Sequence, residues 1–93
     1  MTLKINETNF ETEVANSNQP VLITFYASWC RTQRLLNMIE QLSFELNGIA
    51  KVVRVDVEES PNIAIQFDVS ELPSFAVLDS GKIKSTRELK IPA

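Results

Sequence analysis

The sequence predicts a single α/β domain over residues 1–93, with helices flanking a central mixed β-sheet. Apolar, β-branched runs alternate with segments whose apolar residues follow helical spacing, and this order builds α/β domains. Turn and helix-cap residues separate the segments. A chain of 93 residues is long enough to form one domain without disulfide or metal staples.

The N-terminal part of the chain predicts two strands with a helix between them. Residues 3–5 can form a short first strand. Thr8 and Glu11 are spaced as in a capping box, so we expect a helix with Thr8 as its N-cap. Residues 21–26 are apolar at nearly every position, which is typical of a central strand covered on both faces.

A longer helix is predicted from Arg31 onward. Its apolar residues recur at helical spacing and are expected to pack in the core: Leu35, Met38, Ile39, Leu42 and Leu46. Asn47-Gly48 ends this helix, because glycine tolerates the left-handed conformation that follows a helix terminus.

The second half of the chain predicts a strand, a short helix and a final pair of strands. Residues 51–57 are rich in valine, which favours a strand. Ser60-Pro61 is typical of a helix start. Residues 74–78 form the next expected strand, and the turn signal at 79–82 predicts an antiparallel return from Ile83.

Composition excludes several classes of function. A net charge of −3 argues against a nucleic-acid partner. No apolar run is long enough to span a bilayer, so we expect no membrane association. Because the chain has no histidine and one cysteine, we expect no metal and no cofactor. The single cysteine and the lack of a signal-peptide pattern predict a cytoplasmic location.

The only cysteine, Cys30, lies in the run Ala-Ser-Trp-Cys-Arg-Thr-Gln at residues 27–33, directly after the central strand. We expect it in the first turn of a helix, where the helix dipole and Arg31 favour an exposed, ionised thiol. The alternative is a buried and inert cysteine, which is common in soluble domains.

The strand, the Trp-Cys pair and the following helix resemble the active-site entry of the thioredoxin family, whose motif is Trp-Cys-Gly-Pro-Cys. The order of elements resembles the thioredoxin fold, a three-layer sandwich, over essentially the whole chain. Leu72-Pro73 stands where the family has its cis-proline, and further matches are Phe25, Pro61 and Ser80-Gly81. The chain stops where the family has its last helix. We therefore expect either a partly bare sheet face that a partner chain or a homodimer covers, or a rearrangement of the last dozen residues.

Other positions depart from the family pattern. Gln33 stands at the second cysteine, and Thr24 stands where the family keeps a buried aspartate. The remaining departures are Arg31-Thr32 for Gly-Pro, Met38 for a helix-kinking proline, and Leu89 for a glycine near the substrate groove. The joint loss of the second thiol and the aspartate indicates that dithiol turnover is not the chemistry of this chain.

The resemblance implies a thiol–disulfide exchange function in which Cys30 is the nucleophile. It would form mixed disulfides with client proteins that carry thiols or disulfides, with no resolving cysteine. Any enzymatic activity is then at most monothiol exchange. The resemblance places the following residues in the client groove or near the thiol: Trp29, Arg31, Leu72 and Pro73 in the groove, Thr24 and Gln33 near the thiol.

Two other functions stay open. The first is a non-catalytic thioredoxin-fold adaptor or chaperone-like binding module, in which Cys30 is incidental. The second is a glutathione-dependent enzyme of the glutaredoxin type, which the sequence around Cys30 favours least.

Two clusters of charged residues are interpreted as parts of the surface. The acidic cluster is interpreted as a solvated loop face: Asp56, Glu58 and Glu59. The basic cluster is interpreted as protection of an exposed strand edge: Lys82, Lys84, Arg87 and Lys90.

Overall fold

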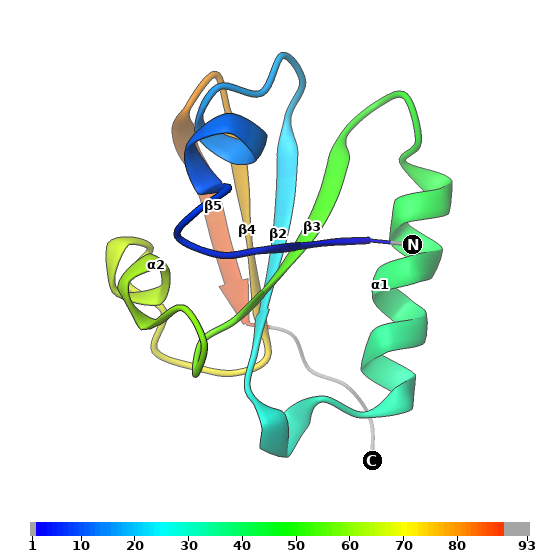
Figure 1. Cartoon of the computed structure of the whole chain (residues 1–93). Helices are drawn as coiled ribbons and strands as arrows, with labels where there is room; N and C mark the ends of the chain where they lie inside the picture. Colours follow the sequence, from blue (N-terminus) through cyan, green and yellow to red (C-terminus); the bar gives the residue numbers. More distant parts are fainter. Residues whose placement is uncertain (1, 89–93) are drawn as a thin grey trace.

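One mixed five-stranded sheet, with helices on both faces, forms the centre of the computed structural model, which describes residues 2–88 (Figure 1). Its strands are β1 (Leu3–Ile5), β2 (Val21–Tyr26), β3 (Lys51–Asp56), β4 (Ser74–Asp79) and β5 (Lys82–Glu88). They lie in the order β1-β3-β2-β4-β5. Strands β1, β3 and β2 are parallel, and β4 and β5 pair antiparallel with their neighbours. The α/β fold class predicted from the sequence is confirmed.

The helical segments divide between the two faces of the sheet. They are η1 (Glu11–Ala15), a π-helical turn, η2 (Ser28–Cys30), a 3₁₀ turn, and the α-helices α1 (Gln33–Glu45) and α2 (Pro61–Gln66). Figure 1 shows α1 on one face, and η1 and α2 on the other. Neither α-helix is long and apolar enough to cross a membrane.

The central strand β2 contributes side chains to two apolar clusters, one on each face. Ile23 and Phe25 belong to the cluster that includes Val14 of η1 and Ile63 of α2. Tyr26 belongs to the cluster with Leu35 and Ile39 of α1, on the opposite face. This two-sided burial explains why residues 21–26 are apolar at nearly every position.

Helix α1 begins two residues later than the sequence predicted. Thr32 is its N-cap, and the Thr32 hydroxyl accepts a 3.1 Å hydrogen bond from the backbone N–H of Leu35. Arg31 has a non-helical backbone and lies before the cap. At the other end, Gly48 adopts a φ of +85°, as expected for a glycine after a helix.

The predicted capping by Thr8 is wrong. The side-chain oxygen of Asn6 accepts the backbone N–H groups of Thr8 and Asn9, at 2.9 and 3.1 Å. The side chain of Asn9 accepts the N–H of Asn6 in return, at 2.8 Å. The Asn6 side chain folds back onto the backbone two and three residues further on, so the turn starts before Thr8.

A two-residue hairpin joins β4 to β5, as the turn signal predicted. Ser80 and Gly81 both have positive φ, at 55° and 77°, which matches the right-handed twist of the two strands. Asp79 pairs with Lys82 at the mouth of the turn. The predictions for Leu89 and Lys90, and the prediction of a missing last helix, concern residues outside the described range.

Candidate active site

The residues around Cys30 form a tight turn at the carboxyl end of β2. Cys30 is the last residue of η2, and its backbone N–H donates a 3.1 Å hydrogen bond to the carbonyl oxygen of Ala27. The N–H of Thr32 donates to the carbonyl of Cys30 at 2.9 Å. The chain then enters α1 at Gln33, so the prediction that Cys30 lies in the first turn of a helix is wrong.

The Cys30 thiol is mostly covered by its neighbours. The residue is 9% exposed and packs in the α1-side cluster with Tyr26 and Leu35. Its sulfur lies 3.3 Å from the backbone nitrogen of Ala27, which donates to it, and 3.4 Å from the carbonyl oxygen of Ala27, to which the thiol donates. The expectation of an exposed thiol is therefore wrong, because the tight turn directs the side chain toward the cluster.

The residues that the family resemblance places in a client groove come from two segments, the turn around Cys30 and Leu72–Pro73. The Leu72–Pro73 peptide bond is cis, and both residues are half-buried. Leu72 packs against the same cluster that contains Cys30. Trp29 is 71% exposed, and Arg31 is also exposed. The fold therefore packs Leu72 against the cluster that contains Cys30, and it leaves Trp29 and Arg31, the chain neighbours of Cys30, open to solvent.

The side chains at the two positions where the sequence departs most from the family are not bonded to the thiol. The Gln33 amide donates a 2.8 Å hydrogen bond to the side-chain oxygen of Asn37, one turn further along α1. Thr24 is 1% exposed, and its hydroxyl has no hydrogen-bond partner. Thr24 lines an apolar depression of about 310 Å³ together with Leu22, Leu42 and Phe75.

Glu58 is a site residue that the sequence reasoning did not identify. Its carboxylate accepts a 2.7 Å hydrogen bond from the backbone N–H of Ser28, the first residue of η2. This backbone N–H, then the Ser28 side chain, and then the charge of Arg31 hold the pKa of Glu58 below its ordinary value. The available signal was topological, because β2 and β3 are parallel neighbours and their carboxyl ends lie at the same sheet edge.

The interpretation of Asp56 as part of a solvated face is wrong. Asp56 is 7% exposed, and its carboxylate accepts the backbone N–H groups of Glu58 and Glu59 at 2.9 and 3.4 Å. It therefore shapes the loop that presents Glu58 to η2. Glu58 and Glu59 are exposed, as expected, and Glu59 forms an ion pair with Lys4.

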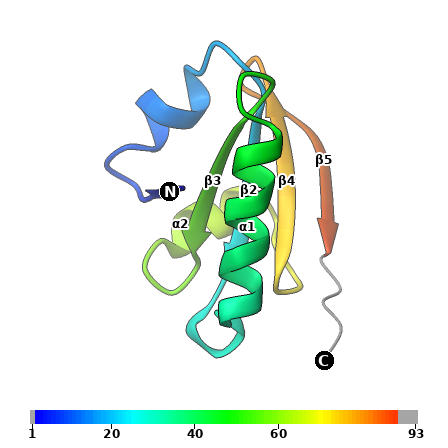
Figure 2. The ribbon, with the colours of Figure 1, turned by 90° about the vertical axis from the view of Figure 1, so that its right-hand side faces the viewer.

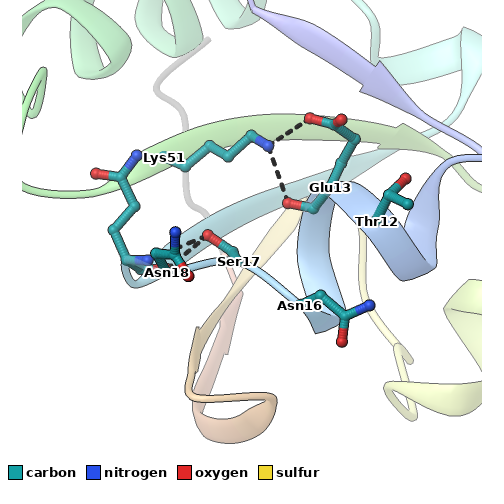
Figure 3. A pocket seen from close by; sticks show the side chains of 7 residues that line it. Thr12, Glu13, Asn16, Ser17, Asn18 and Lys51 are labelled. Atoms are coloured by element: carbon teal, nitrogen blue, oxygen red, sulfur yellow. Dashed lines mark hydrogen bonds and ion pairs between the residues drawn. The ribbon is translucent and has the colours of Figure 1, made fainter.

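A larger polar hollow lies at the opposite end of the sheet (Figure 3). Its lining includes Thr12, Glu13 and Lys51, and the Lys51 ammonium group binds the carboxylate and the backbone carbonyl of Glu13. Lys51 begins β3 and pairs in register with Val21, whereas the candidate site lies beyond Tyr26 at the other end of β2. We interpret the Lys51–Glu13 contact as a tie between η1 and the sheet.

The described residues contain no group of three or more cysteine, aspartate or glutamate side chains placed to hold a metal ion.

Comparison with known proteins agrees with this arrangement. A family model described as Thioredoxin matches residues 1–91. The chain is 38% identical over 76 residues to the thioredoxin of Chlorobaculum thiosulfatiphilum, covering 81% of this chain and 70% of the relative. It is 32% identical over 88 residues to the thioredoxin of Rickettsia felis, covering 94% and 84%. The chain belongs to the thioredoxin family, and this membership supports a function in thiol–disulfide redox chemistry.

Proposed function

We propose that this protein exchanges disulfides with client proteins through one thiol, Cys30, and forms mixed disulfides that an outside thiol resolves. The observation that carries the proposal is the position of Cys30. It is the only cysteine of the chain, and it lies at the carboxyl end of β2 in the same cluster as Leu72. Thioredoxin-family proteins generally act on protein thiols and disulfides.

The exchange step balances without a cofactor. The deprotonated sulfur of Cys30 attacks one sulfur of a client disulfide, the client S–S bond breaks, and the second client sulfur leaves as a thiolate. Position 33, where a resolving thiol would stand, holds a glutamine whose amide is bonded to Asn37. A second external thiol, such as glutathione or another client cysteine, therefore has to release Cys30 and complete the turnover.

The environment of Cys30 supports the other roles in this proposal. In this proposal Leu72 and Pro73 form one wall of the client groove, and the exposed Trp29 and Arg31 form the other. The backbone of Leu72 is the proposed pairing partner for an extended client segment, in the manner of an added strand. The 9% exposure of Cys30 means that a client has to present its disulfide within this groove to react.

The direct test is capture of a client disulfide. Purified protein is mixed with an oxidised peptide disulfide, and the products are identified by intact mass. We expect a covalent adduct on Cys30 that persists until glutathione is added. A Cys30→Ser variant is the control and should form no adduct. If the unmodified protein forms no adduct while unfolded protein does, Cys30 is not a nucleophile in the folded state.

One observation favours a second candidate function, a non-catalytic adaptor. The apolar depression is lined by residues of β2, β4 and α1, namely Leu22, Thr24, Phe75 and Leu42. Figure 2 shows α1 lying along one face of the sheet, with β4 and β5 to one side of the helix. We propose for this alternative that a partner chain or a second copy covers the depression. The Cys30→Ser variant separates the two functions, because an adaptor would keep its partner and a covalent exchanger would lose it.

A further inference from the structure

Arg54 carries a positive charge that no described carboxylate neutralises. It lies in the middle of β3, half-buried, and one guanidinium nitrogen donates a 2.7 Å hydrogen bond to the neutral hydroxyl of Tyr26. Among the side chains that the structure describes, those of residues 2–84, none forms an ion pair with it. Its parallel neighbours in register are Thr24 on β2, which is uncharged, and Lys4 on β1, a cation that is paired with Glu59. A partly buried guanidinium in this state favours binding of an anion.

The Arg54 guanidinium borders an open depression of about 260 Å³ on the α1 face of the sheet. The other lining residues are Thr2, Arg31, Leu36 and Glu40. The carboxylate of Glu40 accepts the backbone N–H of Thr2 at 2.9 Å, which fixes it at one side of the depression. The lining therefore includes two guanidinium groups, those of Arg31 and Arg54, and one carboxylate, that of Glu40.

The depression is connected to the candidate active site by two direct links. Arg31 follows Cys30 in the chain, so one wall of the depression is the segment that leaves the thiol. Tyr26 provides the second link, because it packs in the cluster with Cys30 and its hydroxyl holds Arg54. A group bound between Arg31 and Arg54 would therefore belong to a molecule that is also close to the thiol.

We propose that the depression between Arg31 and Arg54 is a carboxylate-binding subsite that selects clients with an acidic side chain near the reactive cysteine. Guanidinium groups match the planar fork of a carboxylate. The charge balance favours a singly charged carboxylate over a phosphate, because Glu40 would repel a second negative charge. This inference depends on the proposed function of Cys30 in one respect: the carboxylate belongs to a client only if Cys30 reacts with clients.

The first experiment measures binding without any covalent step. In the Cys30→Ser variant, the NMR signals of the arginine Nε–H groups are followed during titration with two blocked peptides, Gly-Glu-Gly and Gly-Gln-Gly. We expect saturable shifts of the Arg54 and Arg31 signals with the glutamate peptide only, and we expect them to weaken as salt is raised. Equal responses to both peptides, or shifts that avoid Arg54, would overturn the proposal whether or not Cys30 reacts.

The second experiment measures selection during exchange. Two peptides with an activated cysteine disulfide, one with glutamate and one with glutamine beside the cysteine, react with the native protein. We expect the glutamate peptide to react about threefold to fivefold faster at low salt, which is the size of effect that a partly exposed ion pair gives. Adduct formation at equal rates with both peptides would contradict the carboxylate-binding subsite, but it would be consistent with the proposed function of Cys30.

Matched variants locate the effect. Arg31→Gln changes an exposed residue outside the helices and strands, so it should fold normally and lose most of the selection between the two peptides. Arg54→Lys keeps the positive charge but loses the forked geometry of the guanidinium, so it should lose part of the selection between the two peptides. Lys82→Gln removes one exposed positive charge at the start of β5 and should keep the full selection. Loss of selection in Lys82→Gln would show a general charge effect and contradict the subsite.

Glutathione is the other source of carboxylates, and the same titration distinguishes it. If reduced glutathione saturates the Arg54 signal while the glutamate and glutamine peptides do not differ, the depression serves a small thiol and the assignment to acidic clients is wrong. If the glutamate peptide saturates the signal and glutathione competes only weakly, the assignment to clients stands.

Discussion

The backbone N–H of Ser28 donates a 2.7 Å hydrogen bond to the carboxylate of Glu58, and this bond joins the turn before Cys30 to the loop after β3. The contact crosses between the carboxyl ends of two parallel strands. It fixes the first residue of η2, while the bonds between Cys30 and Ala27 fix the last. A charged acceptor makes a stronger hydrogen bond than a neutral one, so the turn should be most rigid when Glu58 is ionised.

Glu58→Gln should therefore lower stability in a pH-dependent way. The pKa of Glu58 is lowered from 4.5 in the folded protein, chiefly by the Ser28 N–H. A lowered pKa contributes stability that is present above 4.5 and is lost as pH falls through the folded value. We expect the variant to unfold at a lower urea concentration than the parent protein at neutral pH, and we expect this difference to shrink as the pH falls below 4.5.

Glu71→Gln is the control for this experiment, because Glu71 is also exposed and lies outside η2 and the β3 loop. It should shift the urea midpoint by a small amount that does not change in the same way with pH. A gap between the Glu58→Gln and parent proteins that stays constant from pH 7 to acid would show that the ionised carboxylate does not stabilise the turn.

Gln33→Cys should shorten the lifetime of mixed disulfides on Cys30. A thiol at position 33 would lie at the start of α1, just after the Cys30 turn, and an intramolecular thiol acts at an effective concentration of mM or more. We expect the peptide adduct to be released without added glutathione, at least about tenfold faster than in the parent protein. The measurement is adduct mass against time, with Gln33→Ser as the control for loss of the bond to Asn37.

Thr24→Val should stabilise the fold. The Thr24 hydroxyl is buried without a hydrogen-bond partner, and valine replaces it with a methyl group of nearly the same shape. Removing an unsatisfied buried polar group is worth about 1–3 kcal/mol. Urea unfolding should therefore show a higher midpoint for Thr24→Val and a lower one for Thr24→Ser, which keeps the hydroxyl and loses the methyl. A lower midpoint for Thr24→Val would mean that the hydroxyl has a partner in solution.

Asn6→Ala should destabilise the N-terminal turn, and Thr8→Ala should not. The Asn6 side chain accepts two backbone N–H groups, whereas Thr8 is exposed and supplies only its own backbone N–H to the turn. Loss of a capping asparagine typically costs about 0.5–2 kcal/mol. Urea unfolding of the two variants tests this directly, and an equal loss in both would restore Thr8 as a contributor to the cap.

Periodicity alone predicted the parts of this fold whose burial is strongest. The apolar run in β2 and the stripe on α1 place their side chains where both clusters need them, so strand and helix types were readable. Sequence patterns did not predict which residue caps the N-terminal turn. Asn6 and Thr8 are both of a type that caps helices well, and only the course of the backbone decides which side chain accepts its N–H groups. The predicted helix start at Arg31 was wrong because it also depended on which side chain caps the helix. The Thr32 hydroxyl accepts the N–H of Leu35, so the helix begins after Thr32.

Only those features of the site that depend on neighbouring residues in the sequence could be predicted. The run around Cys30 identified the thiol, but its exposure depended on the direction of the turn and on packing by Tyr26 and Leu35. The roles of Glu58 and Arg54 depend on partners 30 and 28 residues away along the chain. Such contacts follow from strand order and register, and no local motif encodes them.

Because the chain has a single cysteine, no internal disulfide can link the stability of its fold to the redox potential of its surroundings. A dithiol protein closes a loop when it is oxidised and gains or loses stability with each cycle. Here the one thiol of the chain can form no internal ring, and its own turn is held by hydrogen bonds between Cys30 and Ala27. After an outside thiol releases Cys30, the folded protein has the same covalent connectivity as before the exchange, and the net redox change of the cycle lies on the client and on that outside thiol.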